Sequence, residues 1–151
     1  MHQFQVETVI NAPRTAVWQA LADIGNIYQW NPGVRASHST SDAGTGVGAT
    51  RYCDLGGSNY LDEEVVHWQP NEAVTMRITG TNLPFATADI RFMLREEGDG
   101  TAVSVSPIYQ LKFGLLGKLL NAVYVNKNYK QGMIALLAGL KKFVETDLEA
   151  G

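Results

Sequence analysis

The chain has 151 residues, of which 45% are hydrophobic and 18% charged, and 12 basic against 15 acidic side chains give a net charge of −3. These values predict one globular domain over residues 1–151 and exclude a disordered chain. Nucleic acid is not expected as a partner, because no basic cluster exceeds Lys141-Lys142.

The N-terminal part predicts a strand followed by two short helical segments. Residues 2–10 alternate in polarity as a strand does, and Pro13 suits the first turn of a helix, where a missing N–H costs nothing. Apolar residues then recur at helical spacing until Gly25, and Asn31-Pro32-Gly33 ends the helical section. The apolar positions are Val17, Trp18, Leu21 and Ile24, followed by Tyr28 and Trp30.

The middle of the chain predicts six strands separated by turn-rich segments. One separator, Gly44-Thr45-Gly46-Val47-Gly48, has the composition of a phosphate-binding loop. It precedes a strand instead of joining a strand to a helix, so we interpret it as a turn. The predicted strands cover approximately residues 34–41, 48–55, 60–69, 73–80, 86–96 and 101–112.

The C-terminal part predicts one long helix from Gly117 to about Glu149. It contains no proline, and its apolar residues recur at helical spacing while its lysines can face water. Its centre, residues 126–132, is polar and ends in Gly132, where a uniform core would favour large aliphatic residues. The expected apolar face comprises Leu116, Leu120, Val123, Met133, Leu136, Leu137, Leu140, Phe143 and Val144.

Two neighbouring strands each carry a charge on a mainly apolar face. Because side chains alternate along a strand, Arg51 shares a face with Ala49, Cys53 and Leu55, and Glu63 shares one with Leu61, Val65 and His67. If the strands pair so that Cys53 opposes Leu61, then Arg51 opposes Glu63, close enough for a charge-assisted hydrogen bond. Such a pair either ties two strands together or lies in the wall of a cavity that receives a partly polar molecule.

No metal or cofactor is expected. His67 follows Glu63 by four residues on one predicted strand, which separates them by about 13 Å and excludes a shared zinc ion. Cys53 is interpreted as a small buried hydrophobic residue. It is the only cysteine in the sequence, so an internal disulfide is excluded. No signal-peptide pattern is visible, and no apolar run approaches the ~20 residues that span a bilayer, so we expect a cytoplasmic protein without stable membrane insertion.

The order strand, two short helices, six strands and long helix resembles the START-like helix-grip superfamily, and most of all its polyketide cyclase/dehydrase (SRPBCC) branch. The resemblance covers nearly the whole chain. Each motif alone is weak evidence, and the resemblance rests on the order and spacing of the motifs together. The motifs are Val9-Ile10-Asn11-Ala12-Pro13-Arg14-Thr15-Ala16-Val17-Trp18, Trp30-Asn31-Pro32, Gly46-Val47-Gly48-Ala49-Thr50-Arg51, Glu63-Glu64-Val65, Gly100-Thr101-Ala102-Val103 and Leu140-Lys141-Lys142-Phe143-Val144-Glu145.

The resemblance implies an α+β helix-grip fold, in which a curved seven-stranded antiparallel sheet wraps around the C-terminal helix and encloses an apolar cavity. By position, Arg51 and Glu63 resemble polar pocket residues, and residues 55–59 lie where related receptors have a mobile gate. Tyr109 shares the inward face of its strand and can either offer a phenol to the cavity or pack in the core. The expected ligand-binding residues are Arg51, Cys53, Leu55, Glu63, Val65, Tyr109, Asn128, Gly132 and Leu136.

Two classes of function remain, since this fold hosts many. The first is binding of a small hydrophobic or amphipathic molecule of the polyketide, lipid or isoprenoid type. The second is a polyketide cyclase or dehydratase acting on a poly-β-ketone, with Arg51, Glu63 and Tyr109 as candidate catalytic residues. We favour binding, because an arginine partner stabilises the charged carboxylate and weakens it as a base. A protein-interaction module is a weaker alternative, and the sequence does not define an oligomeric state.

Overall fold

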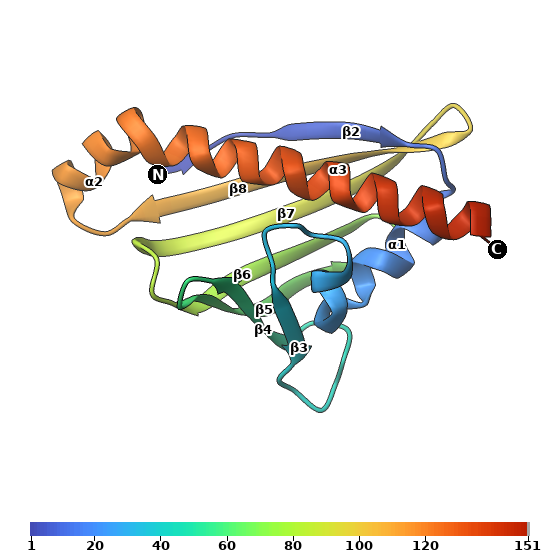
Figure 1. Ribbon diagram of the computed structural model, residues 1–151, viewed down its shortest axis with the longest axis horizontal. Coiled ribbons are helices and arrows are strands. Elements are labelled where there is room, and N and C mark those ends of the chain that lie inside the picture. Colours follow the sequence, from blue (N-terminus) through green and yellow to red (C-terminus); the bar gives the residue numbers. More distant parts are fainter. Residues whose placement is uncertain (151) are drawn as a thin grey trace.

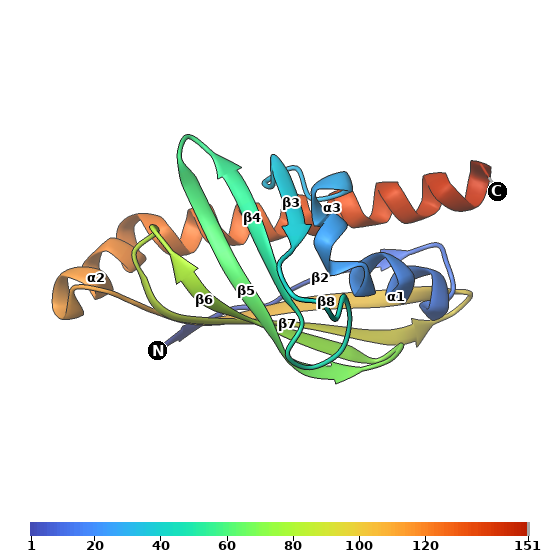
Figure 2. The ribbon, with the colours of Figure 1, turned by 90° about the horizontal axis from the view of Figure 1, so that it is seen from below.

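The computed structural model describes residues 1–150, and the side chains of residues 1–148. One antiparallel sheet curves around the long C-terminal helix α3 (Asn126–Ala150), as Figures 1 and 2 show from two directions. Helix α1 (Arg14–Ala22) lies near the C-terminal end of α3, and α2 (Gly114–Leu120) lies at the opposite end of the molecule (Figure 1).

The sheet has the strand order β1-β8-β7-β6-β5-β4-β3, and β2 also pairs with β8. Because β1 and β2 both pair antiparallel with β8, they are one strand position interrupted at residues 4–5, which agrees with the seven strands expected. The strands are β1 (His2–Gln3), β2 (Val6–Ile10), β3 (Ala36–Ser39), β4 (Thr50–Gly56), β5 (Asn59–Gln69), β6 (Ala73–Thr81), β7 (Phe85–Glu97) and β8 (Gly100–Leu111).

The two helical segments after the first strand form as predicted. Pro13 is the residue immediately before α1, with an extended backbone, so it starts the helix without occupying it. A short 3₁₀ helix, η1 (Ile24–Gln29), follows and buries Ile24, Gly25 and Ile27. Together with the concave face of the sheet and α3, these segments enclose the main hydrophobic core.

The β4–β5 hairpin fixes the register on which the site depends. Its turn residues Gly57 and Ser58 both have positive φ, 59° and 71°, as a two-residue hairpin loop requires. Cys53 pairs with Leu61 and Arg51 with Glu63, which confirms the pairing predicted from the alternation.

Further along β5, the alternation prediction is wrong for His67. The pairing with β6 shifts between Val65 and His67, which is a bulge, and His67 is exposed instead of sharing the inward face of Glu63. Trp68 turns inward instead and packs edge-on against Trp18, with ring centroids 5.0 Å apart.

The C-terminal helix begins earlier than Gly117 and is not uniform. Helix α2 leads through a π-helical turn, η2 (Asn121–Val125), into α3. Leu136, Leu137, Leu140 and Val144 are buried as expected. The prediction fails at the start of the apolar face, because Leu116, Leu120 and Val123 lie beyond the part of the helix that the sheet covers and are 57%, 40% and 71% exposed.

One close contact between α3 and the η1–β3 connection depends on a glycine. A Cβ atom at Gly139 would lie 2.0 Å from the carbonyl oxygen of Trp30 and 3.0 Å from Cδ of Pro32. The absence of a side chain at Gly139 therefore lets residues 30–32 pack directly on the helix.

Candidate functional site: an apolar pocket between the sheet and the terminal helix

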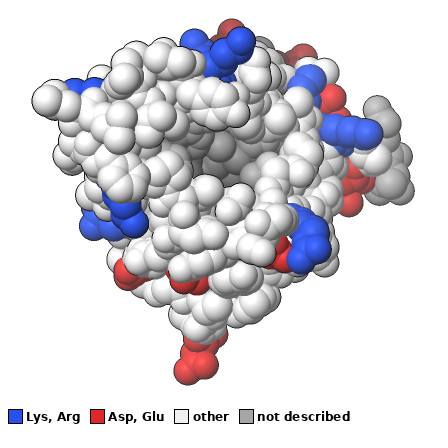
Figure 3. Space-filling model, turned by 60° about the vertical axis from the view of Figure 1, so that its left-hand side comes forward, with Lys and Arg blue, Asp and Glu red and all other residues white. Residues whose placement is uncertain are grey.

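A pocket of about 470 Å³ lies between the concave face of the sheet and the helical segment that contains η2 and α3. Figure 3 shows a hollow on the face at the α2 end, bordered mainly by uncharged residues. The walls come from β4 to β7, from the η1–β3 and β6–β7 connections, and from one side of the helix. The lining residues are Ile27, Asn31, Gly33, Val34, Arg51, Cys53, Leu55, Leu61, Glu63, Met76, Ile78, Leu83, Pro84, Phe85, Ile90, Phe92, Tyr124, Val125, Asn128, Tyr129, Gly132, Met133 and Leu136.

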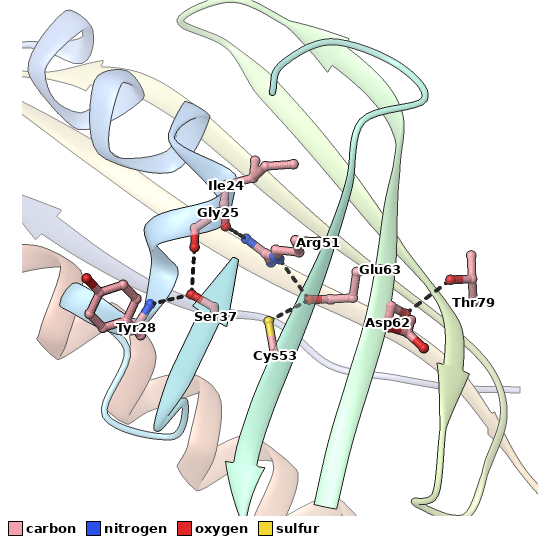
Figure 4. A network of polar contacts seen from close by, with 9 residues as sticks. All are labelled: Ile24, Gly25, Tyr28, Ser37, Arg51, Cys53, Asp62, Glu63 and Thr79. Atoms are coloured by element: carbon pink, nitrogen blue, oxygen red, sulfur yellow. Dashed lines mark hydrogen bonds and ion pairs between the residues drawn. The ribbon is translucent and has the colours of Figure 1, made fainter. Parts of the chain in front are cut away.

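Arg51 and Glu63 are the two charged residues in this lining, and they neutralise each other. Arg51 Nε donates to Glu63 Oε1 over 3.0 Å, and Nη1 donates to the carbonyl oxygen of Ile24 over 3.1 Å. Figure 4 shows the guanidinium held between η1 and β5. Their side chains are only 5% and 3% exposed, so each charge depends on the other for compensation.

Cys53 adds a weak third contact to this pair. Its Sγ lies 3.7 Å from Glu63 Oε1 and donates to that carboxylate (Figure 4). Burial, with smaller contributions from Glu63, raises the pKa of the Cys53 thiol to about 12. The thiol is therefore neutral at physiological pH and is not a nucleophile.

The helix contributes the opposite wall of the pocket. Asn128, Gly132 and Leu136, spaced four residues apart, all line it, as the resemblance implied. A Cβ atom at Gly132 would have no atom within 4 Å, so the glycine leaves open space at the pocket. Tyr129, between these positions, also lines the pocket, and burial raises the pKa of its phenol, which keeps it neutral.

Two of the expected pocket residues lie outside the lining. Val65 is fully buried in the main core. Tyr109 is also fully buried, but in a second cluster beside the pocket, where its hydroxyl donates to Asn121 Oδ1 and its ring packs at 5.1 Å from that of Tyr129. The Tyr109 hydroxyl therefore links β8 to η2 through a hydrogen bond, and Tyr109 does not line the pocket.

The family model described as polyketide cyclase / dehydrase and lipid transport matches residues 1–145. The chain belongs to this family. No curated protein matches it in sequence.

Solved structures similar to this family member extend the comparison to the fold. A protein of Thermus thermophilus is 20% identical, with a TM-score of 0.80 over 97% of this chain and 99% of its own. A START superfamily protein of Mycobacterium smegmatis is 18% identical, with a TM-score of 0.79 and the same coverage of 97% and 99%. Ginseng major latex-like protein 151 of Panax ginseng is 14% identical, with a TM-score of 0.76 over 94% of this chain and 96% of its own. At these identities the likeness establishes the helix-grip fold and not a shared activity.

The sequence reasoning missed most of the apolar wall of this family member's pocket. Met76 and Ile78 on β6, and Ile90 and Phe92 on β7, line the pocket at alternate positions. Their period of two was visible in the sequence, but the same pattern describes any half-buried strand. Met76, Ile90 and Phe92 also belong to the main hydrophobic core, so the pattern does not separate pocket residues from core residues.

Two further properties of the described part of the chain bear on the class of site. Among the side chains of residues 1–148, no group of three or more His, Cys, Asp or Glu is arranged to hold a metal ion. No described helix is long and apolar enough to cross a membrane.

Proposed function

We propose that this protein binds a small hydrophobic or amphipathic molecule of the polyketide, lipid or isoprenoid type in the pocket beneath α3. The supporting observation is the character of the lining, in which apolar side chains predominate and the two charges are paired with each other. A volume of about 470 Å³ lies within the range of small-molecule sites. The proposed contact residues are Arg51, Cys53, Leu55, Glu63, Asn128, Gly132 and Leu136.

The geometry also supports a polar end on the ligand. Arg51 uses Nε and Nη1 for Glu63 and Ile24, and its Nη2 forms no hydrogen bond with any residue that the structure describes. Because Arg51 lines the pocket, we propose that this nitrogen donates to one acceptor atom of a ligand. An amphipathic molecule with a carbonyl or hydroxyl group fits that arrangement.

A cyclase or dehydratase is the second candidate, since the same Arg51 donor suits a developing enolate. It would also need a group that removes an α-proton. Glu63, the candidate base, is held by Arg51 and Cys53, so it is not a free base in this geometry, and Tyr109, a candidate donor to the enolate, lies outside the pocket. Ligand binding without catalysis therefore agrees better with this geometry than a cyclase or dehydratase activity does.

The test measures the affinity of an apolar fluorescent probe, N-phenyl-1-naphthylamine, for Gly132→Leu. The new side chain would extend into the open space beside Gly132, so we expect a Kd at least about tenfold higher, with unchanged or higher thermal stability. Gly44→Leu is the matched control, because a Cβ atom at Gly44 would also have nothing within 4 Å and Gly44 lies outside the pocket lining. Unaltered probe binding in a folded Gly132→Leu would contradict the proposal.

Arg51→Gln, measured at a temperature at which circular dichroism shows the variant to be folded, separates the two candidate functions. A binding protein should lose only part of its affinity for a polyketone mimic, because most of the contact area is apolar. A cyclase should lose turnover of that compound far more than affinity, as expected for a group that acts on the transition state. Native mass spectrometry of freshly purified protein would identify any co-purified ligand directly.

A further inference from the structure

The segment that joins β8 to α3 exposes an unusual amount of apolar surface. Six large side chains here are between 57% and 82% exposed, although soluble surfaces rarely gather so many in one place. We call them the α2 apolar patch: Phe113, Leu115, Leu116, Leu119, Val123 and Tyr124.

The patch surrounds a helix that touches the rest of the protein along a narrow line. Gly117 and Asn121 are buried, while their neighbours on both sides are exposed. A Cβ atom at Gly117 would lie 2.4 Å from the carbonyl oxygen of Lys112, so this glycine permits the close approach that anchors α2. The apolar side chains project from the end of the molecule where α2 lies in Figure 1.

The charged residues along the chain segment that carries the patch are all of one sign. Lys112, Lys118, Lys127 and Lys130 are exposed, and the chain contains no Asp or Glu between Asp99 and Glu145. None of these four lysines forms an ion pair with any residue that the structure describes, in contrast to Lys141, which pairs with Glu145 over 2.7 Å. A protein with a net charge of −3 thus carries only basic side chains along the segment that contains the exposed apolar helix.

We propose that the α2 end of the protein docks on an anionic lipid bilayer. A helix with exposed Phe, Leu and Tyr side chains and flanking lysines has the composition that enters the boundary between headgroups and acyl chains. The lysines would lie near anionic headgroups while the α2 apolar patch enters the interface. This docking is superficial and requires no membrane-spanning helix.

The lysines near the α2 apolar patch favour an anionic bilayer over a second copy of the chain as the partner that covers the patch. A symmetric dimer through this patch would bring the same surface of both copies together, and therefore two sets of lysines. Like charges placed across an interface cost binding free energy. An anionic bilayer satisfies the apolar and the basic side chains at once.

The position of Tyr124 connects this surface to the pocket. Its side chain belongs to the α2 apolar patch and also lines the pocket, together with Leu83 and Pro84 of the β6–β7 connection. Docking through the patch would therefore bring the bilayer to the pocket side of the molecule. The docking itself does not depend on what the pocket binds, and vesicle binding tests it separately from probe uptake.

The experiment is flotation of the full chain with vesicles of phosphatidylcholine alone and of phosphatidylcholine with phosphatidylglycerol. We expect binding to the anionic vesicles, weaker binding to the neutral ones, and loss of the difference at high salt. Leu119→Ser should weaken binding about tenfold, since it removes one apolar side chain from the interface. Val47→Ser is the control, because Val47 is 68% exposed in the β3–β4 connection and belongs neither to the patch nor to the pocket.

Two lysine variants test the contribution of the basic side chains to membrane binding. Lys118→Gln should weaken binding to anionic vesicles about fivefold and leave binding to neutral vesicles unchanged. Lys142→Gln, at an exposed lysine outside the patch, should change neither. If Leu119→Ser failed to fold, Leu115→Ser would replace it, because the Leu115 side chain is 82% exposed.

Three results would overturn the proposal. One is absence of binding of the unmodified protein to anionic vesicles. Another is undiminished binding of a folded Leu119→Ser or Leu115→Ser. The third is a stable dimer in sedimentation velocity that Leu119→Ser converts to monomer, which would show that a second copy covers the patch.

Discussion

Removing the carboxylate of Glu63 should destabilise the protein far more than removing the adjacent one of Glu64. In Glu63→Ala the Arg51 guanidinium, 5% exposed, keeps the Ile24 carbonyl as a partner but loses the only counter-ion that it has among the side chains the structure describes. Breaking a buried pair in this way typically costs ~3–5 kcal/mol. For a chain of this length that corresponds to a decrease in Tm of roughly 6–20 °C.

Glu64→Ala is the matched control, because Glu64 lies on the opposite face of β5 and is only half-buried. Its removal should change Tm by no more than about 2 °C, as for surface substitutions of ~0.5 kcal/mol. Thermal unfolding followed by circular dichroism measures both. The double variant Arg51→Met/Glu63→Leu should recover most of the loss, since it strands no charge. Equal Tm values for Glu63→Ala and Glu64→Ala would refute the interpretation of a buried, mutually dependent pair.

Two further predictions concern α3. Gly139→Ala should destabilise the protein by ~1–3 kcal/mol, because the new Cβ would collide with the Trp30 carbonyl. Gly132→Ala should stabilise the protein by ~1 kcal/mol, because its Cβ would meet no atom within 4 Å and alanine favours the helix. Chemical denaturation of both variants checks that the two changes in unfolding free energy have opposite signs. The hydrogen bond from the backbone N–H of Asn11 and the nearby Lys141 ammonium hold the pKa of Glu145 below its ordinary value. The Glu145 carboxylate therefore stabilises the fold at pH values above its unfolded pKa. This contribution is lost as pH falls through the lowered folded pKa. Glu145→Gln should therefore cost about 1 kcal/mol at neutral pH and progressively less in acid, and a constant difference across a pH series of unfolding curves would contradict this.

The hairpin around Arg51 and Glu63 was predictable from the sequence because its determinants are local. A two-residue turn fixes the register of β4 and β5, and alternation then decides that both charges share one face. The same reasoning failed at His67, where a bulge adds one residue to β5 and reverses the alternation. A bulge depends on the pairing with β6, and the sequence of β5 alone does not specify it.

The helical pattern of the C-terminal segment determined that a helix forms, but not which part of it is covered. Leu136 and Leu137 are buried while Leu116 and Leu119 are exposed, although all four occur in similar apolar surroundings along the chain. The difference arises because α2 extends past the sheet, and the extent of a sheet is a property of all its strands together.

The sequence by itself determined the order of the elements, the charge pair and the polar centre of the long helix, since these follow from spacing within single segments. Tertiary structure decided which inward residues reach the pocket. Arg51 lines it and Val65 does not, although both point to the concave face of the sheet. Side chains of α1 and η1 fill the space between the sheet and the C-terminal part of α3, whereas the cavity remains beneath the helical segment from Tyr124 to Leu136. That difference depends on the packing of the whole sheet against α3, which no local pattern in the chain encodes.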